Sequence, residues 1–230
     1  MARSALITGG TGGLGAAVTT AFLQSGWRVV VPLYAEAERE RVTPHERLVL
    51  EQADLFDADS AAAVTALAAG DAGAPLGAVV NLVGGFAMGE RLHATPIEDF
   101  EAQLRLNLRP AYLVCQAALP HLISAGGGAI VCVSSRAAVK PFKGAAGYIV
   151  SKAAVLSFVD VLATEYRDDR IRANAVLPSV IDTPGNRSAM PDADFERWVT
   201  PEQIAAVVRF LCEDGSGIVS GAHVPVYGRA

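Results

Sequence analysis

The sequence has few cysteines, no strong excess of either charge and no long uninterrupted apolar segment. Its three cysteines, Cys115, Cys132 and Cys212, lack C-x-x-C or metal-ligand spacing, which argues against a disulfide framework and a metal site. A net charge of −5 supplies neither a basic footprint for nucleic acid nor a polybasic patch for a membrane. No uncharged apolar stretch is long and glycine-poor enough to span a bilayer, and the N-terminus lacks a secretory pattern. We therefore expect a cytoplasmic protein with no nucleic-acid or membrane partner.

Hydrophobic residues make up 51% of the 230-residue chain, which is enough for a sizeable core. Segments with strand character alternate with longer segments that have the spacing of a helix face. Strands are expected at 3–8, 27–33, about 46–50, 77–83, 129–134, 171–177 and 222–226, and helices at about 17–26, 58–69, 96–125 (with a break or kink at Pro110), 146–166 and 201–213. Val- and Ile-rich strands suit a parallel sheet covered on both faces. No repeat or linker divides the chain, so we expect an α/β protein with a single domain over residues 1–230.

A glycine-rich turn follows the first expected strand. Residues 9–15 read Gly-Gly-Thr-Gly-Gly-Leu-Gly and precede an amphipathic pattern that ends near Gly26. Glycines let the backbone approach a pyrophosphate, and the free amides and dipole at a helix N-terminus attract the anion. The order of strand, turn and helix therefore predicts a phosphate cradle.

A tyrosine and a lysine lie one helical turn apart later in the chain. Tyr148 and Lys152 have i, i+4 spacing, and Ser135 lies thirteen residues before Tyr148, so the tyrosine and lysine share one helix face. A nearby ammonium favours the phenolate, and we expect Lys152 to lower the pKa of Tyr148 from its usual value near 10. Ser135 can then hold a substrate oxygen while Tyr148 exchanges a proton with it.

These motifs, in this order, resemble the short-chain dehydrogenase/reductase family over nearly the whole chain. The resemblance implies a Rossmann-type, doubly wound parallel sheet in three α/β/α layers. It also implies an NAD(P)-dependent oxidoreductase that transfers a hydride between nicotinamide and a small carbonyl/alcohol substrate, with Tyr148 as acid/base and Ser135 and Lys152 as its partners. Asn107 lies where the family has a fourth catalytic residue that holds a water; alternatively, it satisfies backbone groups inside a helix.

The resemblance further implies where the cofactor lies. The expected contacts are Thr8, Gly9, Thr11, Gly13, Leu14 and Gly15 in the first turn, Tyr34 after the second strand, Asp54 and Leu55 after the third, Asn81, Val83 and Gly84 after the fourth, Tyr148 and Lys152, and Pro178, Ile181 and Thr183 after the sixth.

The residues after the second strand leave the choice between NAD(H) and NADP(H) unresolved. An NAD enzyme normally has an acid here that binds the ribose 2′-hydroxyl, but the chain has Pro32, Leu33 and Tyr34. Two glutamates, Glu36 and Glu38, come further on, and Arg39 and Arg41 could swing towards a 2′-phosphate. The missing acid also leaves room for weak dinucleotide binding.

Two alternatives to a carbonyl reductase stay open. The chain is similar to dihydropteridine reductases over residues 177–198 and in the run Val83-Gly84-Gly85-Phe86. That family lacks the catalytic serine that this chain has at Ser135. A protein of another class, a dinucleotide sensor or scaffold without turnover, would have little reason to keep Ser135, Tyr148 and Lys152 together.

Substrate size and assembly follow from two further features. The connection between Thr183 and the helix at 201 is short for the family, which favours a small or protruding substrate in an open cleft. Four basic residues lie near the expected mouth of the cleft. They either attract an anionic group of the substrate or belong to a solvated charged loop: Arg136, Lys140, Lys143 and Arg187. The family resemblance implies a homotetramer or homodimer through the helices at about 96–125 and 146–166.

Overall fold

The computed structural model describes residues 2–229 and contains one seven-stranded sheet in the order β3-β2-β1-β4-β5-β6-β7. The strands are β1 (Ser4–Thr8), β2 (Arg28–Leu33), β3 (Leu48–Gln52), β4 (Leu76–Asn81), β5 (Gly128–Val133), β6 (Ile171–Pro178) and β7 (His223–Val226). Every neighbouring pair is parallel. The expected strands are all present, with ends that differ by one or two residues.

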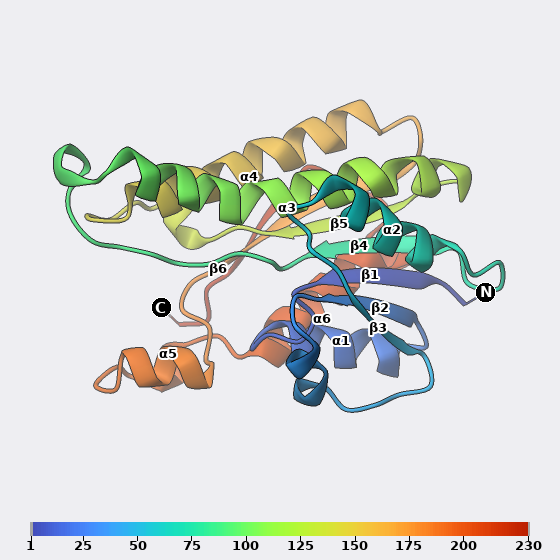
Figure 1. The fold of residues 1–230 in the computed structure, drawn as a ribbon, viewed down its shortest axis with the longest axis horizontal. Helices are drawn as coiled ribbons and strands as arrows, with labels where there is room; N and C mark the ends of the chain where they lie inside the picture. Colours follow the sequence, from blue (N-terminus) through green and yellow to red (C-terminus); the bar gives the residue numbers. More distant parts are fainter. Residues whose placement is uncertain (1, 230) are drawn as a thin grey trace.

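Helices cover both faces of this sheet (Figure 1). They are α1 (Gly15–Gln24), α2 (Ala58–Ala69), α3 (Ile97–Ser124), α4 (Ala146–Glu165), α5 (Pro184–Ala189) and α6 (Pro201–Cys212). One face carries α2, α3 and α4, and the other carries α1 and α6, while α5 projects beyond the sheet. The arrangement confirms the expected doubly wound α/β/α fold.

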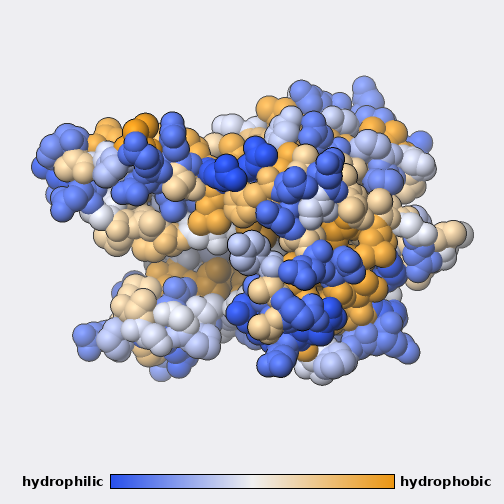
Figure 2. Space-filling model, viewed as in Figure 1, coloured by the Kyte–Doolittle hydropathy of each residue, from blue (hydrophilic) through white to orange (hydrophobic). Residues whose placement is uncertain are grey.

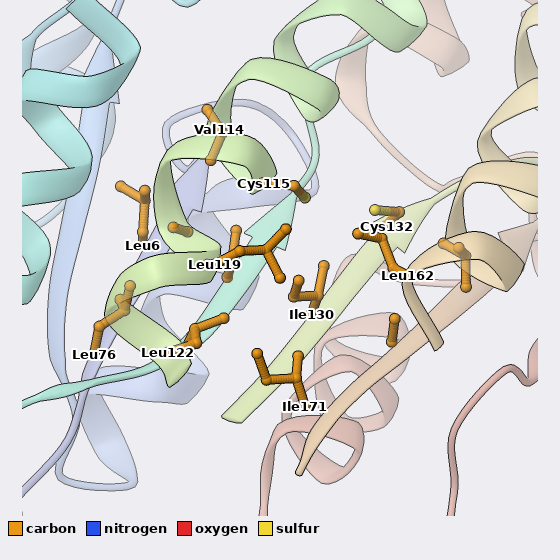
Figure 3. Packing of buried hydrophobic residues seen from close by; sticks show 14 of the residues in the cluster. Leu6, Leu76, Val114, Cys115, Leu119, Leu122, Ile130, Cys132, Leu162 and Ile171 are labelled. Carbon is orange, nitrogen blue, oxygen red and sulfur yellow. The ribbon is translucent and has the colours of Figure 1, made fainter. Parts of the chain in front are cut away.

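The core forms as two apolar layers, one on each face of the sheet. Strand residues of β1 and β4 are completely or almost completely buried, as expected for parallel strands between helices. Figure 3 shows the layer under α3, where Leu119 and Leu122 pack over Ile130 of β5 and Leu76 of β4. Cys132 lies in this layer as a buried free thiol, which confirms the expectation for it.

Of the break or kink expected at Pro110, the break does not occur. Helix α3 continues from Ile97 to Ser124 with Pro110 and Pro120 inside it. A proline inside a helix removes one backbone hydrogen bond and costs about 3 kcal/mol. Here Pro110 is buried, and α3 packs along its length against α4 and α2, so tertiary packing outweighs the local preference for a break.

Helix α4 is long and apolar enough to cross a membrane by length and composition alone. One side of it is buried, including Val155, Val159 and Leu162, and it packs against α3 and β6. This is the position of a core helix, and core helices pass the same test of composition.

The carboxyl ends of all seven parallel strands lie on one side of the molecule, opposite the N-terminus (Figure 1). The chain reverses its direction of winding between β1 and β4, which are neighbours in the sheet. Ligands of such sheets bind at this switch point, beyond the strand ends. Figure 2 shows the surface hollowed on this side, between α5 and the segment that follows β4.

Candidate active site at the carboxyl edge of the sheet

The glycine-rich turn lies at the switch point, between β1 and α1. Gly9 has a φ of 66°, a left-handed conformation that favours glycine. A Cβ on Gly15 would lie 1.9 Å from the carbonyl oxygen of Gly9, so the turn closes this tightly only with glycine. The buried Thr8 hydroxyl accepts a hydrogen bond from the Leu82 amide at 3.2 Å, which joins the turn to the segment after β4.

The N-terminus of α1 is open for an anion. Leu14 at the N-cap provides no side-chain cap, and the first turn contains no acidic residue. Within residues 2–229, the amides of Gly13 and Leu14 have no backbone acceptor. A helix N-terminus with free amides attracts phosphate through hydrogen bonds and the helix dipole. These residues therefore fit the pyrophosphate of a dinucleotide.

Tyr148 and Ser135 lie together beyond β5. Ser135 begins a short 3₁₀ turn, where its hydroxyl accepts a hydrogen bond from the Ala137 amide at 3.1 Å. Tyr148 lies in the first turn of α4. Burial raises the pKa of the Tyr148 phenol, and a hydrogen bond with Ser135 lowers it, with burial the larger effect. The expected direction of this shift is wrong, because burial is the larger effect and raises the pKa; Lys152 is not among the groups that shift the Tyr148 pKa.

Lys152 lies one turn after Tyr148 and points inward. Its ammonium donates a hydrogen bond to the Val133 carbonyl at 3.1 Å, and only 6% of the residue is exposed. Burial lowers the pKa of Lys152 to about 8, although Cys132 acts to raise it. Lys152 is thus an amine whose charge is costly to keep in the folded protein.

Asn107 holds the backbone after β4 against α3 and α4. Its side-chain oxygen accepts from the Gly85 amide at 3.0 Å, and its amide donates to the Gly85 carbonyl at 3.1 Å. The same amide donates to the Gln103 carbonyl and to the Ser151 hydroxyl, each at 3.1 Å. These contacts match the alternative in which Asn107 satisfies backbone groups, and protein atoms occupy the side chain that was expected to hold a water.

Gly84 lies between Asn107 and Lys152. A Cβ at this position would be 2.6 Å from the Asn107 side-chain oxygen and 2.9 Å from the Lys152 ammonium nitrogen. Both distances are too short for a real Cβ, so any other residue here would displace the side chains of Asn107 and Lys152 from their present positions. The expected cofactor segment after β4 therefore passes directly beside the buried lysine.

Two phenylalanines form an exposed aromatic wall beside Tyr148 that the sequence motifs do not single out as a site. The ring of Phe86 meets that of Tyr148 edge to face, with centroids 4.9 Å apart, and Phe142 lies 6.4 Å from Phe86. Phe86 and Phe142 are 56% and 46% exposed. Tyr148 also lines a cavity of about 420 Å³ with Met88, Gln103 and Gly144. Glu90 and Asp99 also line this cavity, so Tyr148 has an aromatic neighbour in Phe86 and a cavity of mixed polarity beside it.

The remaining expected cofactor residues fall into two groups. Leu55 has its side chain in the core, and the Asn81 amide donates to the sulfur atoms of Cys115 and Cys132 at 3.3 and 3.6 Å, so these side chains point away from the cleft. By contrast, Asp54, Val83, Pro178, Ile181 and Thr183 lie at or just after the ends of β3, β4 and β6.

Thr183 brings the segment after β6 against the glycine turn. It caps α5, its hydroxyl accepting from the Asn186 amide at 3.3 Å. A Cβ on Gly13 would lie 2.9 Å from a carbon of the Thr183 side chain. The turn and the start of α5 thus close over the same space.

The segment after β2, which left the choice of cofactor unresolved, folds back towards the glycine turn. Tyr34 is 73% exposed, and residues Glu36–Arg41 form a 3₁₀ helix. The Glu38 carboxylate turns back from it to accept from the Tyr34 amide at 3.2 Å and the Thr11 hydroxyl at 3.3 Å.

The two arginines among the basic residues at the mouth of the cleft are bonded to, or stacked on, other protein groups. Arg187 forms an ion pair with Asp182, with contacts of 2.6 and 2.8 Å, and its guanidinium lies over the Phe195 ring. Arg136 lies over the Tyr227 ring at 5.1 Å. These contacts favour the interpretation of a structural charged loop for both arginines.

A larger cavity, of about 970 Å³, lies elsewhere in the molecule. Arg3, Gly77 and Arg170 line it, at the edge of the sheet where the strands begin. None of the expected site residues lines this cavity within residues 2–229. Size alone therefore does not locate the site, whereas the strand topology does.

Comparisons with known proteins agree with this geometry. A family model described as "Enoyl-(Acyl carrier protein) reductase" matches residues 9–228. The chain is 33% identical to 2-(R)-hydroxypropyl-CoM dehydrogenase of Xanthobacter autotrophicus, with 96% of each chain covered. It is 31% identical to D-threitol dehydrogenase of Mycolicibacterium smegmatis, covering 98% of this chain and 92% of the relative.

Solved structures show the same fold. A short-chain dehydrogenase/reductase from Burkholderia thailandensis superposes with a TM-score of 0.88 at 30% identity, covering 98% of this chain and 91% of that one. The structure "ElxO with NADP Bound" superposes with a TM-score of 0.91 at 24% identity, covering 99% and 98%. With a family model over nearly its whole length and relatives of this similarity, the chain belongs to the short-chain dehydrogenase/reductase family of NAD(P)-dependent oxidoreductases.

Proposed function

We propose that this enzyme interconverts a small carbonyl compound and its alcohol, with Tyr148, Ser135, Lys152 and Asn107 in the roles given below. The observation that carries the proposal is the Tyr148 phenol, which lies close enough to Ser135 for that hydroxyl to affect its pKa, one helical turn from the buried Lys152. A proton donor with an oxygen-binding hydroxyl beside it is what carbonyl reduction needs from the protein.

When bound, the dinucleotide supplies the hydride to the carbonyl carbon. The Ser135 hydroxyl binds the carbonyl oxygen as negative charge develops on it. Tyr148 transfers its proton to that oxygen, and in the oxidative direction it takes the proton back. A phenol is protonated at neutral pH, and burial shifts the pKa of Tyr148 further upward, so the proton is present for donation.

Lys152 and Asn107 position the groups around the reaction. The Lys152 ammonium lies beside Gly84 and the Val133 carbonyl, where it would bind ribose hydroxyls and place a positive charge below the phenol. Asn107 fixes Gly85 through two hydrogen bonds and so sets the path of the backbone along the cofactor. We therefore assign Asn107 a positioning role.

The cofactor would lie along the switch point, held by the other expected residues. The amides of Gly13 and Leu14 are available to the pyrophosphate, and Thr8, Gly9, Thr11 and Gly15 shape the turn. Thr183 is adjacent to Gly13 and would close over the nicotinamide half, with Pro178 and Ile181 beneath it. Asp54 would contact the adenine, whereas Leu55 and Asn81 would contribute only backbone groups, because their side chains lie in the core.

The surroundings of Tyr148 favour a substrate with an apolar or aromatic group beside its carbonyl. Phe86 and Phe142 present exposed ring faces, and burial of an aromatic ring against such faces is favourable. The cleft is open on the solvent side (Figure 2), which agrees with a small or protruding substrate.

Tyr148→Phe tests the proposal against a dinucleotide sensor and a dihydropteridine reductase. Oxidation of NADH and NADPH is followed with aliphatic ketones, aromatic aldehydes, quinones and quinonoid dihydropterin. We expect turnover in the carbonyl panel, a loss of about 10²- to 10⁴-fold in kcat for Tyr148→Phe, and unchanged dinucleotide binding. Tyr166→Phe, which alters a half-buried tyrosine at the opposite end of α4, should leave kcat unchanged.

Each contrary result has a distinct meaning. Turnover of the pterin alone would replace the carbonyl proposal with the dihydropteridine-reductase alternative. Dinucleotide binding without turnover of any substrate would favour the sensor. Equal kcat for the wild type and Tyr148→Phe would refute the assignment of the proton donor.

The proposal includes a homodimer or homotetramer in the cytoplasm. Tyr112 and Ile123 on α3, and Val150 and Val161 on α4, are exposed large apolar side chains, and they give these helices surface for a second copy. Burial of all three free thiols suits a reducing compartment. Light scattering that shows a monomer at micromolar concentration would refute the assembly.

A further inference from the structure

One carboxylate lies where β2 ends and the glycine turn begins, although the sequence has no acid at the end of that strand. Glu38 accepts from the Tyr34 amide and the Thr11 hydroxyl through the same oxygen, at 3.2 and 3.3 Å. Its side chain is only 20% exposed, compared with 64% for Glu36. The chain thus folds back to place this one carboxylate against the turn.

Of the two arginines that could attract a 2′-phosphate, Arg39 is bonded away from the turn, and Arg41 pairs with Glu38. Arg39 binds Glu36 through contacts of 2.6 and 3.3 Å and reaches the Leu50 carbonyl at 3.4 Å. Arg41 lies 3.5 Å from the other oxygen of Glu38 and is 58% exposed, so water screens its charge. At this end of β2, the acid is therefore better placed than the cations.

We infer that Glu38 replaces the missing acid of the second strand and makes the enzyme selective for NAD(H) over NADP(H). A carboxylate accepts about four hydrogen bonds, and three of these positions are used by Tyr34, Thr11 and Arg41. A ribose 2′-hydroxyl can donate to the free position or replace the Thr11 hydroxyl. A 2′-phosphate in the same place brings like charges together, which is strongly unfavourable.

This inference rests on the proposed function, because it takes the glycine turn as the dinucleotide site. Isothermal titration calorimetry with NADH and with NADPH measures it without turnover. We expect the wild type to bind NADH about 100-fold more tightly than NADPH, a difference of about 2.7 kcal/mol. Glu38→Gln keeps the shape but removes the charge, and it should reduce the ratio to less than about tenfold.

Glu40→Gln is the matched control. It makes the same change two residues along the same 3₁₀ helix, at a residue whose side chain has no hydrogen bond or ion pair in the described part of the chain. Its NADH/NADPH ratio should equal that of the wild type. Thermal unfolding of both variants checks that the fold is kept.

Three results would overturn the inference. NADPH binding as tight as NADH binding in the wild type would refute selectivity while leaving the proposed function intact. A preference for NADH that persists unchanged in Glu38→Gln would refute the role of this residue. Failure of the wild type to bind either dinucleotide would refute the proposed function together with the inference.

Discussion

Replacing the buried lysine of the candidate site should stabilise the protein at neutral pH. Lys152 has a pKa of about 8 in the folded protein, lowered from 10.5 by burial. A tenfold change in a proton-binding constant corresponds to about 1.4 kcal/mol, so keeping the ammonium in the folded state at pH 7 costs about 3 kcal/mol. Lys152→Met removes this cost but also removes the hydrogen bond to the Val133 carbonyl, worth about 1 kcal/mol. The expected net gain at pH 7 is about 2 kcal/mol.

The gain should disappear at high pH. Because the folded-state pKa is below that of the unfolded chain, the folded wild type binds fewer protons than the unfolded chain between about pH 8 and 10.5. The stability of the wild type relative to Lys152→Met therefore rises with pH through this window. Above about pH 10.5 the lysine is neutral in both states of the wild type, so the only remaining difference is the hydrogen bond that the variant lacks. The variant should then be about 1 kcal/mol less stable than the wild type.

Urea unfolding of both proteins at pH 7 and pH 10.5 measures the two differences. Lys143→Met, a change at an exposed lysine on a nearby loop, is the control and should alter stability by less than about 0.5 kcal/mol at either pH. A Lys152→Met effect of the same size and sign at both pH values would refute the reasoning, because it would show that burial of the charge has no energetic cost.

Two further substitutions test the supports of the site. Gly84→Ala places a Cβ too close to Asn107 and Lys152, and it should reduce kcat by about 100-fold. The control Gly185→Ala, with no atom within 4 Å of its Cβ, should leave kcat unchanged. Equal kcat values for the two variants would contradict the importance of the close approach at Gly84. Thr200→Ala removes the capping box of α6 and should lower the free energy of unfolding by about 1 kcal/mol while leaving kcat unchanged. Urea titration measures the first effect and the activity assay the second. An unchanged unfolding midpoint would contradict the role of the cap.

The fold was predictable because its signals are local and repeated. Each strand is a short apolar run between turns, and the glycine turn identifies the first βαβ unit. The structure confirms every expected strand and the helices around them. The exception is Pro110, where the local signal for a break loses to the packing of α3 against α4, an interaction that the sequence of α3 alone does not contain.

The proximity of Ser135, Tyr148 and Lys152 was predictable from the sequence, but their electrostatics were not. Spacing brings Tyr148 and Lys152 to one helix face, and strand order brings Ser135 beside them. The direction of the change in the Tyr148 pKa depends on how deeply the phenol is buried, and Phe86 and other distant residues decide that burial. The i, i+4 spacing indicates only the nearby charge of Lys152, which by itself would lower this pKa, and so it predicts the wrong direction.

The residues that were hardest to assign act through partners distant in the sequence. Asn107 binds Gly85 and Ser151, which lie 22 and 44 residues away, and Glu38 reaches Thr11 across 27 residues. In both cases a polar side chain satisfies backbone or hydroxyl groups at the edge of the cleft, and the residue type alone would fit many positions on a surface. Catalytic residues are recognisable from motifs because the chemistry restricts their type and spacing. The family resemblance pointed to Asn107 with a different role, and the contacts of both side chains become visible only in the folded structure.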